Sequence, residues 1–227
     1  MNKAEIRQIL NLNEKFYQSV SKDFSNSRKY PWKGWDRVVK EFKDRMEKGR
    51  ELSTVKIMDL GCGNARFYDF IISKIENVEY TGVDINNDLL LEAERKHKKK
   101  MNNRNKFNLI KKDIFTNISK LRGKYDLVTA FGLTHHIPDD KFRSLWYLKL
   151  PSLVAKNGLL VLTFWNFSKS KGDFLIGWGN ENVARYCHNY SNKEIKDIVS
   201  SLNSKGLILL SDFKSDNENR YLVFGRI

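Results

Sequence analysis

The chain has 227 residues, 41% of them hydrophobic and 30% charged, which is enough to bury one large core and too polar for a membrane-embedded protein. Lys and Arg number 41 against 27 Asp and Glu. The resulting net charge of +14 indicates either a polyanionic partner such as a nucleic acid or a lysine-rich source proteome. No apolar run approaches the roughly 20 residues that cross a bilayer, the first residues lack the apolar core of a signal peptide, and two cysteines are too few for a disulfide framework. We therefore expect a cytoplasmic protein with no membrane contact and no metal site.

The pattern of apolar residues changes after about the first 50 residues. Residues 3–48 have helical spacing with a break near Tyr30 and Pro31. From residue 54 onward, short apolar runs alternate with amphipathic stretches. These runs predict strands at 55–60, 79–83, 107–111, 125–131 and 158–164, and helices at 66–75, 88–99 and 141–155. A helix at 193–202 and a hairpin made of 207–213 and 220–224 are predicted to close the chain.

The alternation of strands and helices predicts a doubly wound α/β fold, in which a mostly parallel sheet is covered by helices on both faces and ends in a C-terminal antiparallel hairpin. In such sheets a ligand binds beyond the carboxyl ends of the strands, where the strand order reverses. The first strand and the turn after it are therefore the place to look for a binding site.

That turn is rich in glycine. It reads Asp59-Leu60-Gly61-Cys62-Gly63-Asn64, in which Gly61 and Gly63 allow the backbone to approach a ligand and to adopt positive φ angles. Asp84 ends the second strand, 21 positions after Gly63, where a carboxylate accepts hydrogen bonds from a ribose diol. Asp113 follows the third strand, where its side chain reaches an adenine amino group or caps a helix.

The glycine turn resembles motif I of the class I S-adenosylmethionine methyltransferases, and the resemblance covers roughly residues 54–165. It implies a Rossmann-like fold with a seven-stranded sheet, and S-adenosylmethionine as the cofactor. A dinucleotide-binding fold would carry a third glycine at position 66, where this chain has Arg66, so a nicotinamide enzyme is the weaker alternative. The residues that the resemblance gives to the cofactor are Asp59 to orient the turn, Gly61 and Gly63 for the methionine part, Asp84 for the ribose, Asp113 for the adenine, and Phe131.

The loop after the fourth predicted strand carries two adjacent histidines. It runs from Phe131 to Asp139, and its position places it beside the sulfonium, where a histidine supplies a base or a hydrogen-bond donor. Many class I methyltransferases of small molecules carry a similar loop, so it identifies no particular substrate. We expect His136 to face the site and His135 to pack or to cap.

Two further blocks lie outside the generic domain, one before the sheet at residues 16–32 and one after the fifth strand at residues 163–191. They are similar to segments of the tRNA wobble-uridine carboxymethyl methyltransferases, and with the core the likeness spans about residues 14–195. The positions at which the chain departs from that family are Ser21, Ser27, Ala65 and Cys187. The departure at Cys187 removes one aromatic ring from an R-Y-Y-H-like segment.

This second resemblance implies esterification of the carboxylate of 5-carboxymethyluridine at the wobble position of tRNA. A carboxylate is already ionised at neutral pH and needs no general base, so the site has to align the attack and hold an anion. Arg28 and Arg185 are predicted to pair with the carboxylate or a phosphate, and together with His136 they are the predicted catalytic residues. The side chains predicted to stack on an unpaired base of the anticodon loop are Tyr186, His188 and Tyr190.

Two alternatives stay open. One is a class I methyltransferase acting on a small acidic metabolite or another nucleic-acid site, with His136 as a true base; the other is a non-catalytic relative that binds nucleic acid or a partner enzyme.

Eukaryotic members of the tRNA family also work with a small zinc-binding activator subunit, which makes such a subunit a possible partner. We expect residues 1–50 to form a helical segment that covers the cofactor and substrate. Residues 51–227 should form the methyltransferase domain, with a substrate-side insertion at about 166–192.

Overall fold

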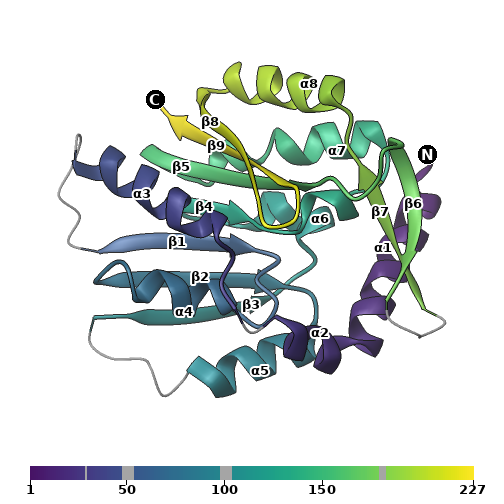
Figure 1. Ribbon diagram of the computed structural model, residues 1–227, viewed down its shortest axis with the longest axis horizontal. Coiled ribbons are helices and arrows are strands. Elements are labelled where there is room, and N and C mark those ends of the chain that lie inside the picture. The colour runs from purple at the N-terminus through teal and green to yellow at the C-terminus, as the bar shows by residue number, and fades with distance from the viewer. Residues whose placement is uncertain (29, 48–53, 98–103, 179–182) are drawn as a thin grey trace.

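The computed structural model describes residues 1–28, 30–47, 54–97, 104–178 and 183–227. Its main feature is a seven-stranded sheet with the strand order β3-β2-β1-β4-β5-β9-β8 (Figure 1). The strands are β1 (Val55–Leu60), β2 (Val78–Asp84), β3 (Lys106–Lys111), β4 (Tyr125–Ala130), β5 (Val154–Trp165), β8 (Leu207–Ser215) and β9 (Asn219–Arg226). The first five run parallel, and β9 pairs antiparallel with both β5 and β8. The predicted doubly wound sheet with a C-terminal hairpin is confirmed.

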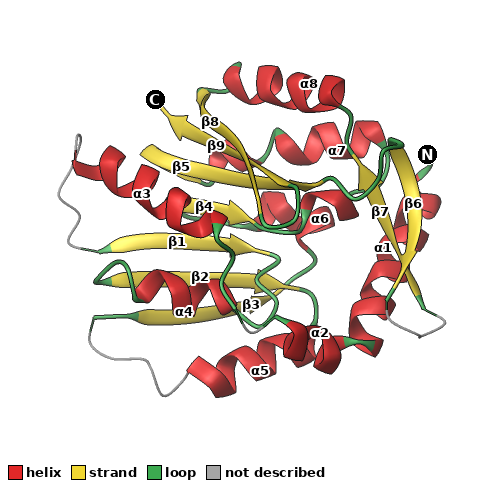
Figure 2. Cartoon of the chain, in the orientation of Figure 1, coloured by secondary structure: helices red, strands yellow, loops and turns green. Residues whose placement is uncertain are grey.

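Helices cover both faces of this sheet and give the domain two hydrophobic cores (Figure 2). One core packs under α3 (Gly34–Glu47), α4 (Arg66–Ile72) and α5 (Asn87–His97). The other packs under α6 (Ile114–Asn117), α7 (Asp140–Tyr147) and α8 (Asn192–Asn203). The central strands β1 and β4 are buried almost throughout, because a strand covered on both faces has to be apolar on both.

The predicted helix at 141–155 is too long. Helix α7 ends at Tyr147, a 3-10 turn follows at Leu150–Ser152, and β5 already begins at Val154. Pro151 lies in that turn and cannot continue a helix. Strand β5 is irregular near its start, where Asn157 has a φ of 64°, and the strand predicted to begin at residue 158 begins at Val154 instead.

The N-terminal segment forms α1 (Lys3–Ser19), α2 (Ser21–Ser27) and α3, with the predicted break between the last two. Helix α1 begins at a capping box in which Asn2 and Glu5 satisfy each other's backbone N–H groups. The predicted insertion contains a separate two-stranded sheet, β6 (Gly172–Gly177) and β7 (Ala184–Asn189). In Figure 1, α1 and this hairpin stand side by side beyond the arrowheads of the parallel strands. The expected domain boundary at 50/51 and the expected helical residues 48, 98 and 99 lie outside the described residues.

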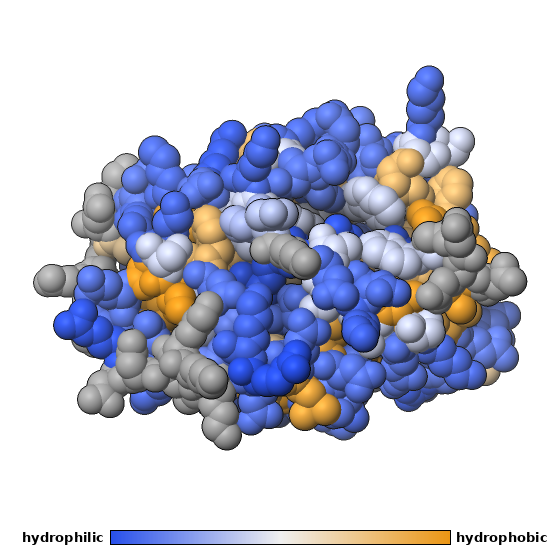
Figure 3. All heavy atoms as spheres, turned by 60° about the horizontal axis from the view of Figure 1, so that its bottom comes forward, coloured by the Kyte–Doolittle hydropathy of each residue, from blue (hydrophilic) through white to orange (hydrophobic). Residues whose placement is uncertain are grey.

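The surface is polar on the face that Figure 3 shows, where small apolar patches are separated by hydrophilic residues. Within the described ranges, no helix combines the length and the apolar character that a membrane span requires.

Candidate active site

A cavity of about 570 Å³ opens at the carboxyl ends of β1, β2 and β4. Its walls come from the turn after β1, the loop after β4, the helices α1 and α2, the hairpin strand β7 and the turn between β8 and β9. Its polar and charged lining residues include Tyr17, Arg28, Asp59, Asp84, His136 and Arg185. The cavity therefore lies where the strand order reverses, as the sequence predicts.

The glycine turn has the conformation that its sequence requires. Gly61 and Gly63 have φ angles of 72° and 55°, and the Gly61 N–H donates to the Val83 carbonyl at 2.8 Å. A Cβ on Gly61 would lie 2.9 Å from a Leu133 methyl carbon. The positive φ angle is the main reason for glycine at this position, since the Leu133 methyl group is the end of a flexible side chain that can shift.

Asp84 connects the turn to the start of α5. Its Oδ2 accepts a hydrogen bond from the Gly63 N–H at 2.8 Å, and its Oδ1 accepts one from the Asn86 N–H at 2.8 Å. Burial raises the pKa of Asp84, and these two bonds oppose that rise. A carboxylate offers about four lone-pair positions, so both oxygens can still accept bonds from a ribose diol in the cavity.

Asp59 lies beneath the turn, where both of its oxygens are used. Tyr80 and Thr129 each donate a hydroxyl hydrogen bond to it at 2.7 Å. Burial raises its pKa to about 6, although these bonds oppose the rise. The side chain lines the cavity, and its two hydrogen bonds connect β1 to β2 and β4.

Asp113 and Phe131 complete the set of predicted cofactor residues, and both line the cavity. Asp113 also caps α6, since its Oδ1 accepts from the Phe115 N–H at 3.0 Å. The side chains of Phe131 and Phe67 meet edge to face, with ring centroids 4.9 Å apart. The cavity thus offers carboxylates at two strand ends, an open glycine turn and an aromatic wall, and this combination of groups fits S-adenosylmethionine.

His136 is held from both sides. Its Nδ1 lies 3.0 Å from the Tyr186 carbonyl and its Nε2 lies 2.8 Å from the Tyr17 hydroxyl. A carbonyl only accepts hydrogen bonds, so Nδ1 carries the proton and Nε2 accepts the bond that Tyr17 donates. Burial lowers the pKa of His136 to about 4, so the ring is neutral at pH 7.

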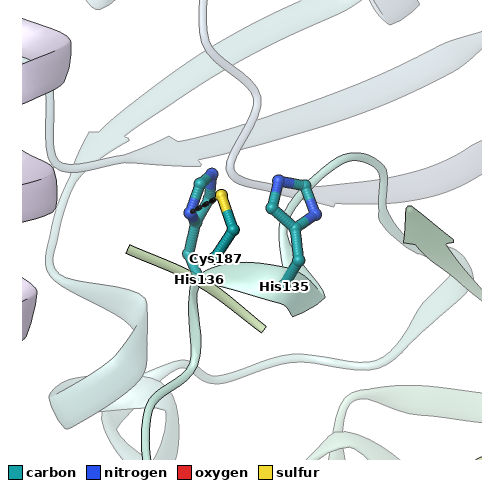
Figure 4. Close-up of side chains that lie close together, drawn as sticks. All are labelled: His135, His136 and Cys187. Carbon is teal, nitrogen blue, oxygen red and sulfur yellow. Dashed lines mark hydrogen bonds between the residues drawn. The ribbon is translucent and has the colours of Figure 1, made fainter. Parts of the chain in front are cut away.

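His135 also lines the cavity, and its ring meets that of Trp165 edge to face. His135, His136 and Cys187 each offer one possible metal ligand atom, and these atoms lie within 4.8 Å of one another (Figure 4). The donor set suits a soft metal. However, His136 Nδ1, which lies 3.9 Å from Cys187 Sγ, already carries the proton that bonds to Tyr186. This side of the ring has no lone pair for a metal, and the arrangement is better described as a packed cluster.

Arg185 and Arg28 line the cavity among aromatic rings. The Arg185 guanidinium is 6% exposed and lies 4.9 Å from the centre of the Phe16 ring and 5.5 Å from that of Trp178. Its Nε and Nη1 are buried without a hydrogen-bond partner, and no described carboxylate lies within ion-pair distance of it. Arg28 is stacked over Phe24 and Trp178, and burial lowers its pKa. Two cationic groups thus line one cavity, and Arg185 has unused donors.

The three rings predicted to stack on an anticodon base do not line the cavity. Tyr186, His188 and Tyr190 are buried on the other side of β7. Tyr190 donates to the Thr134 carbonyl at 2.8 Å, and His188 lies between Asp173 and Glu194 at 2.6 and 2.7 Å. The prediction is corrected on physical grounds: successive side chains of a strand point to opposite sides, so a strand that turns Arg185 toward the cavity turns Tyr186 and His188 away from it. Tyr190 follows the end of β7 and is held away from the cavity by its hydrogen bond to the Thr134 carbonyl.

Two residues of helix α1 that contribute to the site were not predicted from the sequence. Tyr17 lines the cavity, and Asn13 pairs with the backbone of Tyr186, accepting from its N–H at 2.7 Å and donating to its carbonyl at 3.1 Å. Their spacing of four residues on α1 was the available signal, since it puts both on one helix face.

The comparisons with known proteins agree with this geometry. Residues 58–160 match a family model described as a methyltransferase domain. The fold is similar to magnesium protoporphyrin IX methyltransferase from Synechocystis PCC 6803, with 18% identity, a TM-score of 0.66, and 96% of this chain and 97% of that chain covered. It is also similar to 1,6-didemethyltoxoflavin-N1-methyltransferase from Burkholderia thailandensis, with 12% identity, a TM-score of 0.68, and 100% and 91% covered. A third similar structure is an amino pentose methyltransferase from Micromonospora echinaspora, with 13% identity, a TM-score of 0.63, and 92% and 97% covered.

No curated protein matches the chain. At these identities the solved structures establish the fold, and the family model that matches residues 58–160 identifies the activity as methyl transfer. The protein is an S-adenosylmethionine-dependent methyltransferase with the class I fold.

Proposed function

We propose that the protein methylates a carboxylate, and that its acceptor is the carboxymethyl group of a wobble uridine in tRNA. The observation that carries this proposal is the buried Arg185, which lines the cavity with unused donors and has no carboxylate partner among the described residues. A buried cation without a partner is costly, and an anionic acceptor would supply the missing partner. The forked guanidinium suits a carboxylate in particular.

The state of His136 also favours an acceptor that arrives already ionised. S-adenosylmethionine, when bound, supplies a methyl group on a positively charged sulfur. An acceptor hydroxyl or amine would need a base to remove its proton, but His136 Nε2 is occupied by Tyr17 and the pKa of the ring is lowered to about 4. A carboxylate needs no such base at neutral pH.

The tRNA part of the proposal is supported by two segments that resemble the tRNA family. They are far apart in the sequence, yet Arg28 of the first and Arg185 of the second both stack on Trp178 and line the same cavity. The net charge of +14 favours a polyanionic partner. Base stacking on Tyr186, His188 and Tyr190 is no longer part of the proposal, since these rings are buried elsewhere.

A small acidic metabolite is the second candidate acceptor. It is favoured by the walls that α1, α2 and β7 build around the cavity, which suit a small molecule as well as an extruded nucleotide. The similar solved structures named above include enzymes that act on a porphyrin, an amino pentose and a toxoflavin precursor.

One experiment separates the two candidates. The protein is incubated with S-adenosylmethionine labelled in its methyl group, in parallel with bulk tRNA bearing 5-carboxymethyluridine and with a nucleic-acid-free extract of small metabolites. We expect label in a methyl ester of carboxymethyluridine when the tRNA nucleosides are analysed by mass spectrometry. Label that enters only small acids would replace the tRNA proposal with the second candidate.

A further inference from the structure

Three aromatic rings surround the Arg185 guanidinium, and they differ in their access to the cavity. The guanidinium carbon lies 4.9 Å from the centre of the Phe16 ring, and 5.5 and 5.7 Å from those of Trp178 and Trp165. Of these three described rings, only Trp165 lines the cavity, and its side chain is partly buried. A ligand that Arg185 holds in the cavity therefore lies beside Trp165.

The Trp165 ring is held in place by its neighbours. Trp165 is the last residue of β5, so it stands at the carboxyl end of a parallel strand. Its ring meets that of His135 edge to face at a centroid distance of 5.4 Å and lies 4.6 Å from that of Phe167. An indole has only two rotatable side-chain bonds, so it offers a large, rigid and flat contact surface at a low cost in entropy.

The positive charge beside Trp165 comes from Arg185. Burial lowers the pKa of His135, so the imidazole next to Trp165 is neutral. The Arg185 guanidinium is cationic, and its buried Nε and Nη1 have no hydrogen-bond partner among the described residues. The cavity thus combines a cationic group with a flat aromatic surface. A ligand that uses both has an anionic group close to a flat ring.

We propose that Trp165 determines the specificity of the acceptor site, because the ring that bears the carboxylate stacks on it. This inference rests on the proposed carboxylate acceptor and narrows it to acids whose carboxylate is joined to a planar, unsaturated ring by a short arm. A wobble uracil with its carboxymethyl group has this form, and every base offers a π-face to an aromatic side chain. Trp165 thereby takes the stacking role that the buried Tyr186, His188 and Tyr190 do not fill.

Three nucleosides test the charged arm and the flat ring separately. 5-Carboxymethyluridine has a flat ring and a charged arm, its 5,6-dihydro derivative has the same arm on a puckered ring, and 5-carbamoylmethyluridine has a flat ring and an uncharged arm. Each is titrated calorimetrically into the protein saturated with S-adenosylhomocysteine, which carries no methyl group to transfer. In the wild type we expect 5-carboxymethyluridine to bind about three- to tenfold more tightly than its dihydro derivative, the range for one aromatic pair.

Variants assign this preference to one ring. Trp165→Leu should bind the flat and the puckered nucleoside equally, whereas Trp165→Phe, which keeps a flat ring, should retain most of the preference. Trp178→Leu is the matched control and should keep the preference, because Trp178 lies as close to Arg185 but does not line the cavity. The readout is a ratio of two affinities within one variant, so a partial loss of folded protein does not imitate the expected result.

Equal affinity of the wild type for the flat and the puckered ring would overturn the role of Trp165, and so would an equal loss of preference in Trp165→Leu and Trp178→Leu. Failure of the proposed function has a different signature, namely that 5-carbamoylmethyluridine binds as tightly as 5-carboxymethyluridine.

Phenylacetate and cyclohexylacetate form a second pair, in which the same charged arm is carried on a flat or a puckered ring. If phenylacetate binds more tightly than the nucleoside and shows the same dependence on Trp165, the stacking role stands and the acceptor is a small aromatic acid. No binding of any of these ligands would overturn both proposals.

Discussion

Arg143 and Arg185 are both buried, at 5% and 6% exposure, and only Arg143 has carboxylate partners among the described residues. Arg143 pairs with Asp140, lies 3.8 Å from Glu194, and donates to the Ile137 carbonyl at 3.0 Å. Arg185 lies among the rings of Phe16, Trp165 and Trp178, and its Nε and Nη1 are buried without a hydrogen-bond partner. The first arginine is paired within the fold, and the second has no such partner among the described residues.

Replacing each arginine by methionine should therefore have opposite effects on stability. Arg143→Met leaves buried acceptors without their donor and should lower the free energy of unfolding by about 3 kcal/mol. Arg185→Met removes an unpaired buried charge and should leave the free protein as stable as wild type, or more so, while methyl transfer is lost. Urea denaturation combined with a transfer assay checks both, and a large loss of stability in Arg185→Met would show that its charge is satisfied within the protein.

Asp84→Ala should lower the affinity for S-adenosylmethionine about 10- to 100-fold, because the variant lacks the carboxylate that accepts hydrogen bonds from the bound ligand. Asp126→Ala is the control, since Asp126 is also buried and accepts from a backbone N–H, that of Lys56 at 2.8 Å, but does not line the cavity. Calorimetric titration measures the affinities. Equal losses in the two variants would remove Asp84 from the cofactor site.

Asp59 should make stability depend on pH. Its pKa rises from 3.8 to about 6 on folding, so the fold favours the neutral acid. This contribution to the free energy of unfolding is fully present below about pH 4 and is lost as the pH rises through about 6. At 1.36 kcal/mol per unit of pKa shift, it amounts to about 3 kcal/mol. Relative to Asp59→Asn, wild type should become less stable between pH 4 and pH 7 in urea denaturation, and a constant difference would contradict this assignment.

Asn13→Ala should destabilise the hairpin strand β7 by about 1–3 kcal/mol, because the backbone N–H of Tyr186 loses its buried partner. Gln18→Ala on the same helix is exposed and should change the free energy of unfolding by less than about 0.5 kcal/mol. Denaturation curves compare the two, and hydrogen exchange at residues 184–189 shows whether the loss is local to β7. Similar curves for both variants would mean that Asn13 does not anchor this strand.

The sheet and the cofactor side of the cavity could be predicted because their signals are local. The glycine turn, Asp84 and Asp113 each stand at the end of an apolar strand, and parallel strands bring such ends together. The start of β5 was misplaced because an irregular strand with a left-handed Asn157 imitates a turn.

The acceptor side was harder to predict because it is built from segments distant in the sequence. Nothing local indicates that Tyr17 meets His136, 119 positions away. The alternation of side chains along a strand would have separated Arg185 from Tyr186 and His188, because successive residues of β7 point to opposite faces. The resemblance to the tRNA family does not distinguish the two faces of the strand, so it predicts substrate contacts for three rings that are buried in the structure.

The chemical nature of the transferred methyl tests the central claim most directly. Product labelled from S-adenosylmethionine is treated with mild alkali, which hydrolyses methyl esters and leaves methyl groups on nitrogen or carbon in place. If the acceptor group is a carboxylate held by Arg185, the label is released as methanol, and Arg185→Met yields no such product. Label that survives alkali in the wild-type product would contradict the account.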